Sequence, residues 1–287
     1  MDKKIILITG ATRGIGKETA LGLANQGHHI VLHGRNEAHL NEVCDEIKSI
    51  TGNYDIDIIV ADLSLLSNTK QMTEEFKSRY DKLDVLINNA GVYPARIRET
   101  NAEGLEKTMT VNLFAPFLII QSMKSVLLKS ESARIINVSS NMHKYGGRPD
   151  FSDMQFERNY SPMRVYGLSK LYLNWVTQEL SNMLKQRGIN YVTVNSLHPG
   201  SVATNFGEEF YRSFLVKQAF KLAHNFMDEP ADGANTSIYL ATSPEVEKIS
   251  GKYFNKKGKV AKSDNRYWSP DNGKFVFDYC AEIIGQF

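Results

Sequence analysis

The sequence is poor in the residues that build disulfide-bonded or metal-stabilised folds. It has 2 cysteines in 287 residues, Cys44 and Cys280, too few for a disulfide framework, and its 7 histidines show no ligand spacing. Cys44 lies in a helical pattern and is expected to be a small core residue. No apolar run is long enough to span a bilayer, and no signal peptide pattern precedes the first predicted strand. These absences predict a cytoplasmic protein with no bound metal and no stable membrane span.

An excess of charge of one sign is also lacking. Lys+Arg number 34 and Asp+Glu number 32, which gives a formal net charge of +2. So small a charge does not favour nucleic acid or an anionic membrane as a partner. The basic run at 255–259 is therefore interpreted as a solvated loop. The length allows one large α/β domain or two small ones.

Apolar runs and helical patterns alternate along the chain. The predicted strands are 4–8, 29–33, 56–61, 83–87, 134–138, 191–197 and 251–254. The predicted helices are 18–27, 37–50, 67–80, 102–129, 165–187 and 230–242. This alternation predicts an α/β fold, a parallel seven-stranded sheet with helices on both faces. Because no linker divides the chain, we expect a single domain over residues 1–287. Its least regular parts are 143–164, 201–228 and the C-terminal extension, residues 255–287.

A glycine-rich stretch from Thr9 to Lys17 joins the first predicted strand to the first predicted helix. Its glycines, Gly10, Gly14 and Gly16, let the backbone turn sharply and approach a pyrophosphate. The N-terminus of the following helix offers free N–H groups and a positive dipole end. The spacing differs from G-x-G-x-x-G and lacks the Gly-Lys-Ser/Thr ending of a P-loop. The stretch predicts a phosphate cradle, with an unliganded glycine turn as the alternative.

Ser140, Tyr166 and Lys170 are the most informative group of polar residues. Tyr166 and Lys170 lie one helical turn apart and therefore on one face of the predicted helix. A free tyrosine has a pKa of about 10, and a nearby ammonium lowers it. Such a pair acts as a general acid in carbonyl reduction and as a general base in alcohol oxidation. Ser140 can hold the same carbonyl oxygen. A Tyr-x-x-x-Lys pair alone is weak evidence, because surface pairs of this kind are common.

The motifs taken together resemble the short-chain dehydrogenase/reductase family over roughly residues 5–254. They occur in family order: Thr9 to Gly16, Asp62, Asn88 to Gly91, Asn112, Ser140, Tyr166 with Lys170, and Pro199-Gly200 followed by Thr204. This resemblance implies a doubly wound Rossmann-type domain, a nicotinamide cofactor and hydride transfer to or from a carbonyl or alcohol group. The predicted partner is thus a small-molecule carbonyl or alcohol substrate.

The resemblance also assigns catalytic roles. Tyr166 is the expected proton donor or acceptor, and Lys170 is expected to lower its pKa and to bind the nicotinamide ribose. Ser140 is expected to orient the substrate oxygen, with Ser139 as the neighbouring alternative. Asn112 is expected to support a proton-relay water, with a helix interruption as its alternative.

A larger set is expected to bind the cofactor. By resemblance Asp62 contacts the adenine, 89–91 forms a wall beside the adenosine half, and Thr204 contacts the carboxamide. A turn or a helix cap would explain any of these residues singly. The predicted cofactor-binding residues are Gly10, Thr12, Arg13, Gly14, Ile15, Gly16, Arg35, Asn36, Asp62, Leu63, Asn89, Ala90, Gly91, Tyr166, Lys170, Pro199, Gly200, Val202 and Thr204.

Further motifs resemble the retinol-dehydrogenase-like and WW-domain-oxidoreductase-like branch. They are residues 16–20, Ser139-Ser140-x-x-His143, the insert around 151–153 with Tyr160, and His198-Pro199-Gly200. Members of this branch often act on lipophilic carbonyls and alcohols, so a lipophilic aldehyde, ketone or alcohol is the expected substrate. The missing N-terminal membrane segment argues against a membrane-borne retinoid.

The segment after Thr204 has the aromatic spacing of a substrate lid, assigned to about 201–228. Phe206, Phe210 and Phe214 recur one helical turn apart. Three interpretations are open. The three aromatic side chains are core residues if they are buried against the domain, and they line an apolar substrate pocket if they lie over the crevice. They form an interfacial helix if they lie on a membrane. The predicted substrate contacts are Ser140, Met142, Tyr166, Phe206 and Phe210.

The cofactor preference is predicted from the end of the second strand. NAD-preferring dinucleotide folds place a carboxylate there, where it binds the ribose 2′-hydroxyl. This chain has Gly34 at that position and Arg35 after it. Arginine suits phosphate oxygens, and Arg13 can reach the same phosphate. We therefore predict a preference for NADP(H), with NAD(H) as the alternative cofactor and solvated surface arginines as the alternative interpretation.

The sequence predicts an NADP(H)-dependent reductase or dehydrogenase. A cofactor-binding sensor or scaffold without turnover is the second hypothesis, although it would not require Asn112, Ser140, Tyr166 and Lys170 together. A nucleotide-sugar epimerase or dehydratase ranks third, because such proteins usually have a different glycine spacing. The long helices near Asn112 and after Tyr166 can build a four-helix homodimer interface, which the insert before Tyr166 can instead obstruct.

Overall fold

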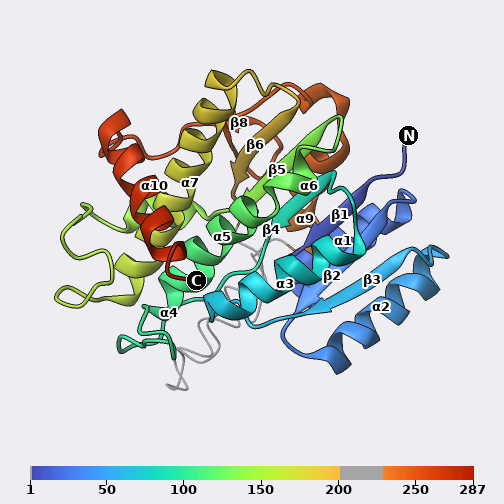
Figure 1. Ribbon diagram of the computed structural model, residues 1–287, viewed down its shortest axis with the longest axis horizontal. Helices are drawn as coiled ribbons and strands as arrows, with labels where there is room; N and C mark the ends of the chain where they lie inside the picture. The colour runs from blue at the N-terminus through green and yellow to red at the C-terminus, as the bar shows by residue number, and fades with distance from the viewer. Residues whose placement is uncertain (1, 201–228) are drawn as a thin grey trace.

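Short apolar runs pair into one sheet in the computed structural model, which describes residues 2–200 and 229–287. The strands are β1 (Ile5–Ile8), β2 (His29–Gly34), β3 (Ile56–Val60), β4 (Val85–Asn88), β5 (Ala133–Val138), β6 (Val192–Leu197), β7 (Tyr253–Phe254) and β8 (Val260–Ala261). Their order is β3-β2-β1-β4-β5-β6-β7-β8 (Figure 1). Every neighbouring pair is parallel except β7 and β8. The predicted parallel α/β sheet is confirmed.

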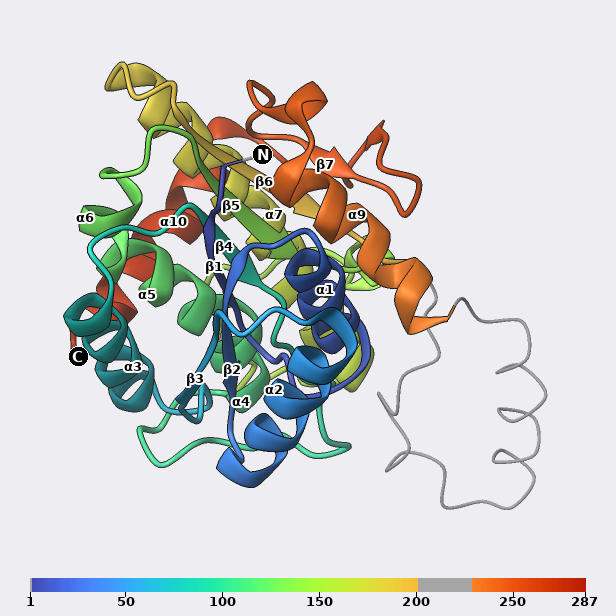
Figure 2. The same ribbon diagram turned by 90° about the vertical axis from the view of Figure 1, so that its right-hand side faces the viewer.

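Helices cover both faces of this sheet. They are α1 (Gly14–Asn25), α2 (Glu37–Thr51), α3 (Leu66–Arg79), α4 (Lys107–Met109), the π-helix η1 (Thr110–Phe114), α5 (Ala115–Ser122), α6 (Lys124–Leu127), the 3₁₀ helix η2 (Asn141–Tyr145), α7 (Pro162–Gln186), α9 (Pro230–Thr242), the 3₁₀ helix η4 (Pro244–Val246) and α10 (Pro270–Ile284). Figure 2 shows α3, α5 and α10 on one side of the sheet and α1, α2 and α9 on the other.

Alternate strand residues enter two separate apolar cores. Leu7 of β1 belongs to the core that contains Phe117 of α5 and Trp175 of α7. Ile6 and Ile8 belong to the core formed with α1, α2 and α9. Because both faces of the sheet are covered, the strands appear in the sequence as continuous apolar runs rather than as an alternating pattern. Cys44 lies in the second core, as predicted.

The C-terminal extension is more regular than its sequence suggested. It contributes β8, which gives the sheet one strand more than the seven predicted, and α10. Ser269 caps α10 by accepting the backbone N–H of Asn272, and Pro270 occupies the first turn. Val276 and Cys280 of α10 are fully buried in the core on the α7 side. The Ser-Pro start and the apolar spacing of α10 were signals of this helix in the sequence.

The single helix predicted for 102–129 is wrong, because the structure divides it into α4, η1, α5 and α6. Pro116, at the start of α5, has no N–H to donate to the carbonyl group of Asn112, and its ring would collide with that group in a regular α-helix. The wider π turn of η1 relieves the conflict by shifting the hydrogen-bond register. Asn112 lies inside this turn, so a helix interruption does occur at a predicted catalytic residue.

Candidate active site

The predicted site residues gather at the carboxyl ends of the parallel strands. The loops after β1, β4, β5 and β6 carry the glycine stretch, residues 89–91, Ser140 and Pro199-Gly200. β1 pairs with both β2 and β4, so the winding of the chain reverses between β1 and β4. Such a reversal opens a crevice outside the carboxyl ends of the strands, which is where ligands bind in open α/β sheets.

The backbone of the glycine stretch requires glycine at three positions. Gly10 and Gly14 have φ angles of 66° and 55°, in the left-handed region. A Cβ on Gly16 would lie 2.2 Å from the carbonyl oxygen of Gly10, which is too close for any other residue. Within the described residues, α1 has no acidic residue in its first turn and no side-chain cap at Arg13. Its first N–H groups therefore suit an anion such as a phosphate.

Side chains from two neighbouring strands hold this stretch in place. The hydroxyl of Thr9 accepts the backbone N–H groups of Asn89 and Ala90, each at 3.0 Å. The Nδ2 of Asn89 donates to the carbonyl oxygens of Thr9 at 2.9 Å and Gly10 at 3.0 Å. Asn89 thus ties the end of β4 to the glycine stretch. Its predicted contact with the adenosine half stays a prediction.

His33 supports the same stretch from the end of β2. Its Nδ1 accepts the N–H of Gly10 at 3.3 Å, so its Nε2 carries the proton and donates to the carbonyl oxygen of Ala61 at 3.2 Å. The ring is 2% exposed. Burial disfavours the charged form and lowers the pKa of His33 from 6.5 to about 4. The neutral ring therefore links the glycine stretch to the residue that follows β3.

Two exposed arginines lie in and near the glycine stretch. Arg13 and Arg35 are both exposed, and neither forms an ion pair with a carboxylate of the described residues. Lys17, by contrast, is 2.6 Å from Glu46. Among the described residues, the guanidinium groups of Arg13 and Arg35 thus have no carboxylate partner, as the phosphate prediction needs.

Gly34 and its surroundings leave no room for a carboxylate. A Cβ on this buried glycine would lie 2.6 Å from Cγ2 of Thr12 and 3.2 Å from Cγ of Leu40. Thr12 thus packs against the end of β2. Asn36 caps α2 by accepting the N–H of His39 at 3.1 Å, which is the helix start that the sequence predicted. A direct cofactor contact by Thr12 or Asn36 stays a prediction.

Tyr166, Lys170 and Ser140 come together where α7 crosses the end of β5. Lys170 Nζ donates to the carbonyl oxygen of Val138 at 2.9 Å, and the hydroxyl of Ser139 donates to the carbonyl oxygen of Lys170 at 3.1 Å. Ser139 is therefore occupied in holding α7. Ser140 forms a side-chain hydrogen bond with Tyr166. This difference supports Ser140, rather than Ser139, as the residue that faces a substrate oxygen.

A close contact between two backbones brings Ser140 to this position. A Cβ on Gly167 of α7 would lie 2.5 Å from the backbone nitrogen of Gly146, just after η2. Glycine at both positions lets η2 lie directly on α7. At the start of η2 the hydroxyl of Ser140 accepts the N–H of Met142 at 3.2 Å. Met142 is half-buried beside the serine.

Burial shifts the proton affinities of the two ionisable residues in opposite directions. The pKa of Tyr166 is raised to about 12, because burial disfavours the phenolate, while the hydrogen bond with Ser140 opposes this shift. The pKa of Lys170 falls from 10.5 to about 8, because burial disfavours the ammonium. That Lys170 lowers the pKa of Tyr166 stays a prediction.

Asn112 fixes the segment that follows β4. Its Oδ1 accepts the N–H of Val92 at 2.9 Å, and its Nδ2 donates to the carbonyl oxygen of Val92 at 3.0 Å and to the hydroxyl of Ser169 at 3.2 Å. A Cβ on Gly91 would lie 3.3 Å from Lys170 Nζ and 3.4 Å from Asn112 Oδ1. The amide and the ammonium thus border the same glycine, and a water relay through Asn112 stays a prediction.

The remaining predicted residues fall into two groups. Asp62 accepts the N–H of Ser64 at 3.0 Å, and Gly200 has a φ angle of 98°. Leu63 is buried, whereas Ile15 in the first turn of α1 and Ala90 and Pro199 after strand ends are half-buried. The predicted residues that lie outside the described part of the chain are Val202, Thr204, Phe206, Phe210 and Phe214.

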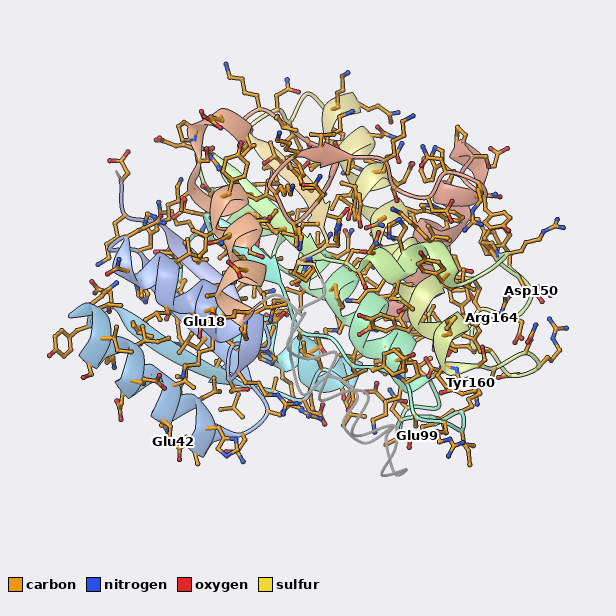
Figure 3. All side chains as sticks on the ribbon, turned by 180° about the vertical axis from the view of Figure 1, so that it is seen from behind. Glu18, Glu42, Glu99, Asp150, Tyr160 and Arg164 are labelled. Atoms are coloured by element: carbon orange, nitrogen blue, oxygen red, sulfur yellow. The ribbon has the colours of Figure 1, made fainter. Side chains whose placement is uncertain are left out.

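A second tyrosine packs beside Tyr166. The ring of Tyr93, two residues after Gly91, is 5.0 Å from the ring of Tyr166. The hydroxyl of Tyr160 donates to the carbonyl oxygen of Ala95 at 2.6 Å. Figure 3 shows Tyr160 and Arg164 at the start of α7, on the same side of the molecule as Glu99. The insert before α7 is therefore joined to the loop that carries Tyr93.

Comparison with known proteins agrees with this geometry. A family model described as short chain dehydrogenase matches residues 4–213. The chain belongs to the short chain dehydrogenase family. It is thus an oxidoreductase acting on CH–OH or C=O groups.

Retinol dehydrogenase 14 of Homo sapiens is 36% identical over 268 residues, which cover 88% of this chain and 78% of the relative. The WW domain-containing oxidoreductase of Homo sapiens is 35% identical over 260 residues, which cover 88% of this chain and 61% of the relative. A solved structure assigned to the short chain dehydrogenases, from Pseudomonas syringae, has a TM-score of 0.69 at 27% identity. The match covers 88% of this chain and 94% of that structure's chain. The predicted branch is confirmed.

Sequence reasoning missed several residues of this dehydrogenase site. Thr9 was noted only as part of a motif, and neither His33 nor Tyr93 was proposed at all. Thr9 and His33 act through tertiary contacts with β4 and β3, which no local pattern reveals. Tyr93 lies two residues after Gly91, the last residue of the predicted Asn-Asn-Ala-Gly stretch, so its position was the available signal. In the part of the chain that the structure describes, no helix has the length and apolar character to cross a membrane.

Proposed function

We propose that this short chain dehydrogenase is NADP(H)-dependent and interconverts a lipophilic aldehyde or ketone with its alcohol, with Tyr166 as general acid and base. The observation that carries this proposal is the meeting of Ser140, Tyr166 and Lys170 at the end of β5, beside Gly91. A passive binding module would not need a buried ammonium beside a buried phenol, because burying both costs free energy.

The residues of the chain fit a dinucleotide. Gly10, Gly14 and Gly16 carry no side chains at the N-terminus of α1, and Arg13 and Arg35 supply exposed cations. Lys170 and the backbone of Gly91, which has no side chain, would bind the nicotinamide half of the dinucleotide. A bound nicotinamide would supply the hydride on reduction and accept it on oxidation.

The protein's part in the reaction is to orient the substrate and move one proton. Ser140 holds the substrate oxygen against the phenol of Tyr166. On reduction the phenol O–H of Tyr166 protonates the developing alkoxide, and on oxidation its phenolate removes the alcohol proton. Because burial alone raises the pKa of Tyr166 to about 12, the Lys170 ammonium has to stabilise the phenolate during turnover.

The preference for NADP(H) rests on charge. Gly34 leaves the end of β2 without a carboxylate that would repel a 2′-phosphate, and a side chain there would collide with Thr12. Arg35, the next residue, is exposed and unpaired among the described residues. A planar guanidinium suits phosphate oxygens.

The proposal of a lipophilic substrate is based on the aromatic ring beside Tyr166 and on the similarity to retinol dehydrogenases. The ring of Tyr93 packs at a tilt against that of Tyr166, and the relative retinol dehydrogenase 14 is named for a lipophilic alcohol. The apolar lid formed by Phe206, Phe210 and Phe214 belongs to this proposal as a sequence prediction. We also place the enzyme in the cytoplasm, because both cysteines are buried and free.

The homodimer through the two long helices is the less favoured assembly. Phe277 of α10 packs against Phe117 of α5 with ring centroids 4.9 Å apart, and Tyr279 packs against Phe114 at 6.0 Å. α10 thus covers parts of α5 and α7, the two long helices of the predicted interface. We therefore propose that the protein does not dimerise through them.

The test is NADPH consumption with aldehydes, ketones and quinones of graded size. Tyr166→Phe removes the proton donor and keeps the ring, and general acid–base groups contribute about 10²–10⁴-fold to the rate. We expect at least that loss in kcat with NADPH affinity retained. Tyr172→Phe, which removes a second buried hydroxyl on α7, is the matched control and should stay active. Near-normal turnover by Tyr166→Phe would refute the mechanism, and no turnover of any substrate by the unmodified protein would favour a sensor or scaffold.

A further inference from the structure

A buried histidine connects the catalytic serine to the C-terminal extension. His143 lies in η2, three residues after Ser140, and is 1% exposed. Its Nδ1 is 2.6 Å from the carbonyl oxygen of Ser140, and its Nε2 is 3.0 Å from the backbone nitrogen of Asp264. The imidazole thus bridges the turn that begins at Ser140 and the chain that follows β8.

The two contacts fix the protonation state of the ring. The N–H of Asp264 can only donate, so Nε2 of His143 must be an acceptor. The proton of the neutral ring is therefore on Nδ1, where it donates to the carbonyl oxygen of Ser140. An imidazolium would direct a second N–H toward the N–H of Asp264 and lose this contact.

The chain around Asp264 is itself held firmly. Its carboxylate accepts from Arg266 at 2.6 Å and 2.9 Å, and Arg266 also donates to the carbonyl oxygen of Lys144. The edge of the His143 ring meets Tyr253 of β7 at a centroid distance of 4.9 Å. The side chain of His143 therefore has contacts with η2, with β7 and with the C-terminal extension.

We propose that His143 is a positioning residue that holds Ser140 in its catalytic orientation by bonding its carbonyl oxygen. This inference rests on the proposed role of Ser140. His143 does not contact the reacting atoms. The hydroxyl of Ser140 already accepts the N–H of Met142, so its direction follows the backbone of the turn, and His143 ties that backbone to the backbone N–H of Asp264.

The charged and titratable neighbours keep the ring neutral at neutral pH. Burial, Lys144 and His198 lower the pKa of His143, whereas the bond to Ser140 and the charge of Asp264 raise it, and the balance is a lowered pKa. Tyr253 also faces the ring, with its hydroxyl bonded to Nδ1 of His198 at 2.8 Å. Arg266, which holds Asp264, is the other charge on the C-terminal side.

The experiment compares two amides that each keep one contact. His143→Asn keeps a side-chain donor near the Ser140 carbonyl and loses the acceptor for Asp264, whereas His143→Gln reaches Asp264 and loses the side-chain contact with that carbonyl. The backbone N–H of residue 143, 3.1 Å from the same carbonyl oxygen, is present in both variants. Since misplacing a group by about 1 Å can cost about 10²-fold, we expect kcat to fall by at least about tenfold in His143→Gln and by less than about threefold in His143→Asn. KM for NADPH should not change. His28→Gln alters an equally buried histidine remote from the site and is the matched control.

The pH dependence of kcat gives a second readout. The unmodified enzyme should lose kcat at acid pH as His143 protonates, and His143→Asn should lack that acid limb, because an amide does not titrate. This readout decides the matter even if His143→Gln does not fold. Equal losses in both variants, or full activity of His143→Gln, would overturn the positioning role. Active Tyr166→Phe would refute the proposed function instead, so the two failures can be told apart.

Discussion

Lys170 donates a hydrogen bond from Nζ to the carbonyl oxygen of Val138 at 2.9 Å, which ties a buried ammonium to the last residue of β5. No carboxylate of the described residues pairs with this ammonium. Burial lowers the pKa of Lys170 to about 8, so the charge is present at neutral pH at a cost in stability. The candidate site therefore keeps a destabilising charge, as the proposed stabilisation of a Tyr166 phenolate requires.

Replacement of Lys170 by methionine should separate activity from stability. The lowered pKa of Lys170 means that the unfolded chain binds its proton more tightly, so the charge destabilises the fold below pH 8 and the penalty disappears as the pH rises from about 8 to 10.5. A pKa lowered by about 2.5 corresponds to at most about 3 kcal/mol. Lys170→Met should be more stable than the unmodified protein at pH 7, with the difference vanishing near pH 10 in urea unfolding. A variant that is equally destabilised at both pH values would contradict this.

The same substitution should change the pH profile of alcohol oxidation. Without the ammonium, the pKa of Tyr166 stays raised by burial, so the phenolate forms only at higher pH. We expect kcat to fall by at least about 10² at pH 8 and its rise with pH to move upward. An unchanged pH profile of kcat would show that Lys170 does not act on Tyr166.

The cofactor preference can be tested through the exposed arginines. Arg35→Ala should weaken NADPH binding by about tenfold or more, because a charge-assisted hydrogen bond contributes about 1.5–3 kcal/mol, and it should leave NADH binding unchanged. Arg187→Ala, at the far end of α7, is the matched exposed control. Titration of both cofactors measures the two Kd values. Equal affinities for NADPH and NADH in the unmodified protein would rule out the preference. Gly34→Asp is a poorer probe, because its side chain would displace Thr12.

Two glycines of α1 should respond differently to alanine. A Cβ on Gly16 would lie 2.2 Å from the carbonyl oxygen of Gly10, which is backbone and cannot move alone. A Cβ on Gly22 would lie 2.4 Å from Cδ1 of Ile238, the flexible end of a side chain. Gly16→Ala should lose NADPH binding and several degrees in Tm. Gly22→Ala should change either quantity little, because the gain of about 1 kcal/mol in helix propensity offsets the repacking. Similar NADPH affinities for the two variants would contradict this account of the glycine stretch.

His33 should make the fold sensitive to acid. Its pKa is lowered to about 4 in the folded protein, so the unfolded chain binds the proton first as the pH falls. Its contribution to stability is complete above pH 6.5 and is lost progressively between pH 6.5 and about 4, by at most about 3 kcal/mol. Unfolding free energies of the unmodified protein and of His33→Asn should converge over this range. Parallel curves would show that His33 is not the group responsible.

Much of this protein was determined by local sequence. The apolar runs of β1 to β6 and the helical patterns between them required a parallel sheet, because a strand that is apolar on both sides must be covered on both faces. The glycine spacing and the Tyr166–Lys170 spacing likewise predicted a tight glycine turn and two side chains on one helix, because a left-handed φ and a helical turn are local properties. The helix cap at Asn36 was also predictable, because capping depends on residues adjacent in the sequence.

The tertiary structure decided what these residues touch. The packing of α10 on α5 and α7 and the bridge from Ser140 through His143 to Asp264 both join segments far apart in the chain. The same is true of the bond between His33 and Gly10. Burial, which makes Lys170 a weaker base and Tyr166 a weaker acid, is a property of the assembled core. No local pattern encodes it, because it depends on what the rest of the chain places around each side chain.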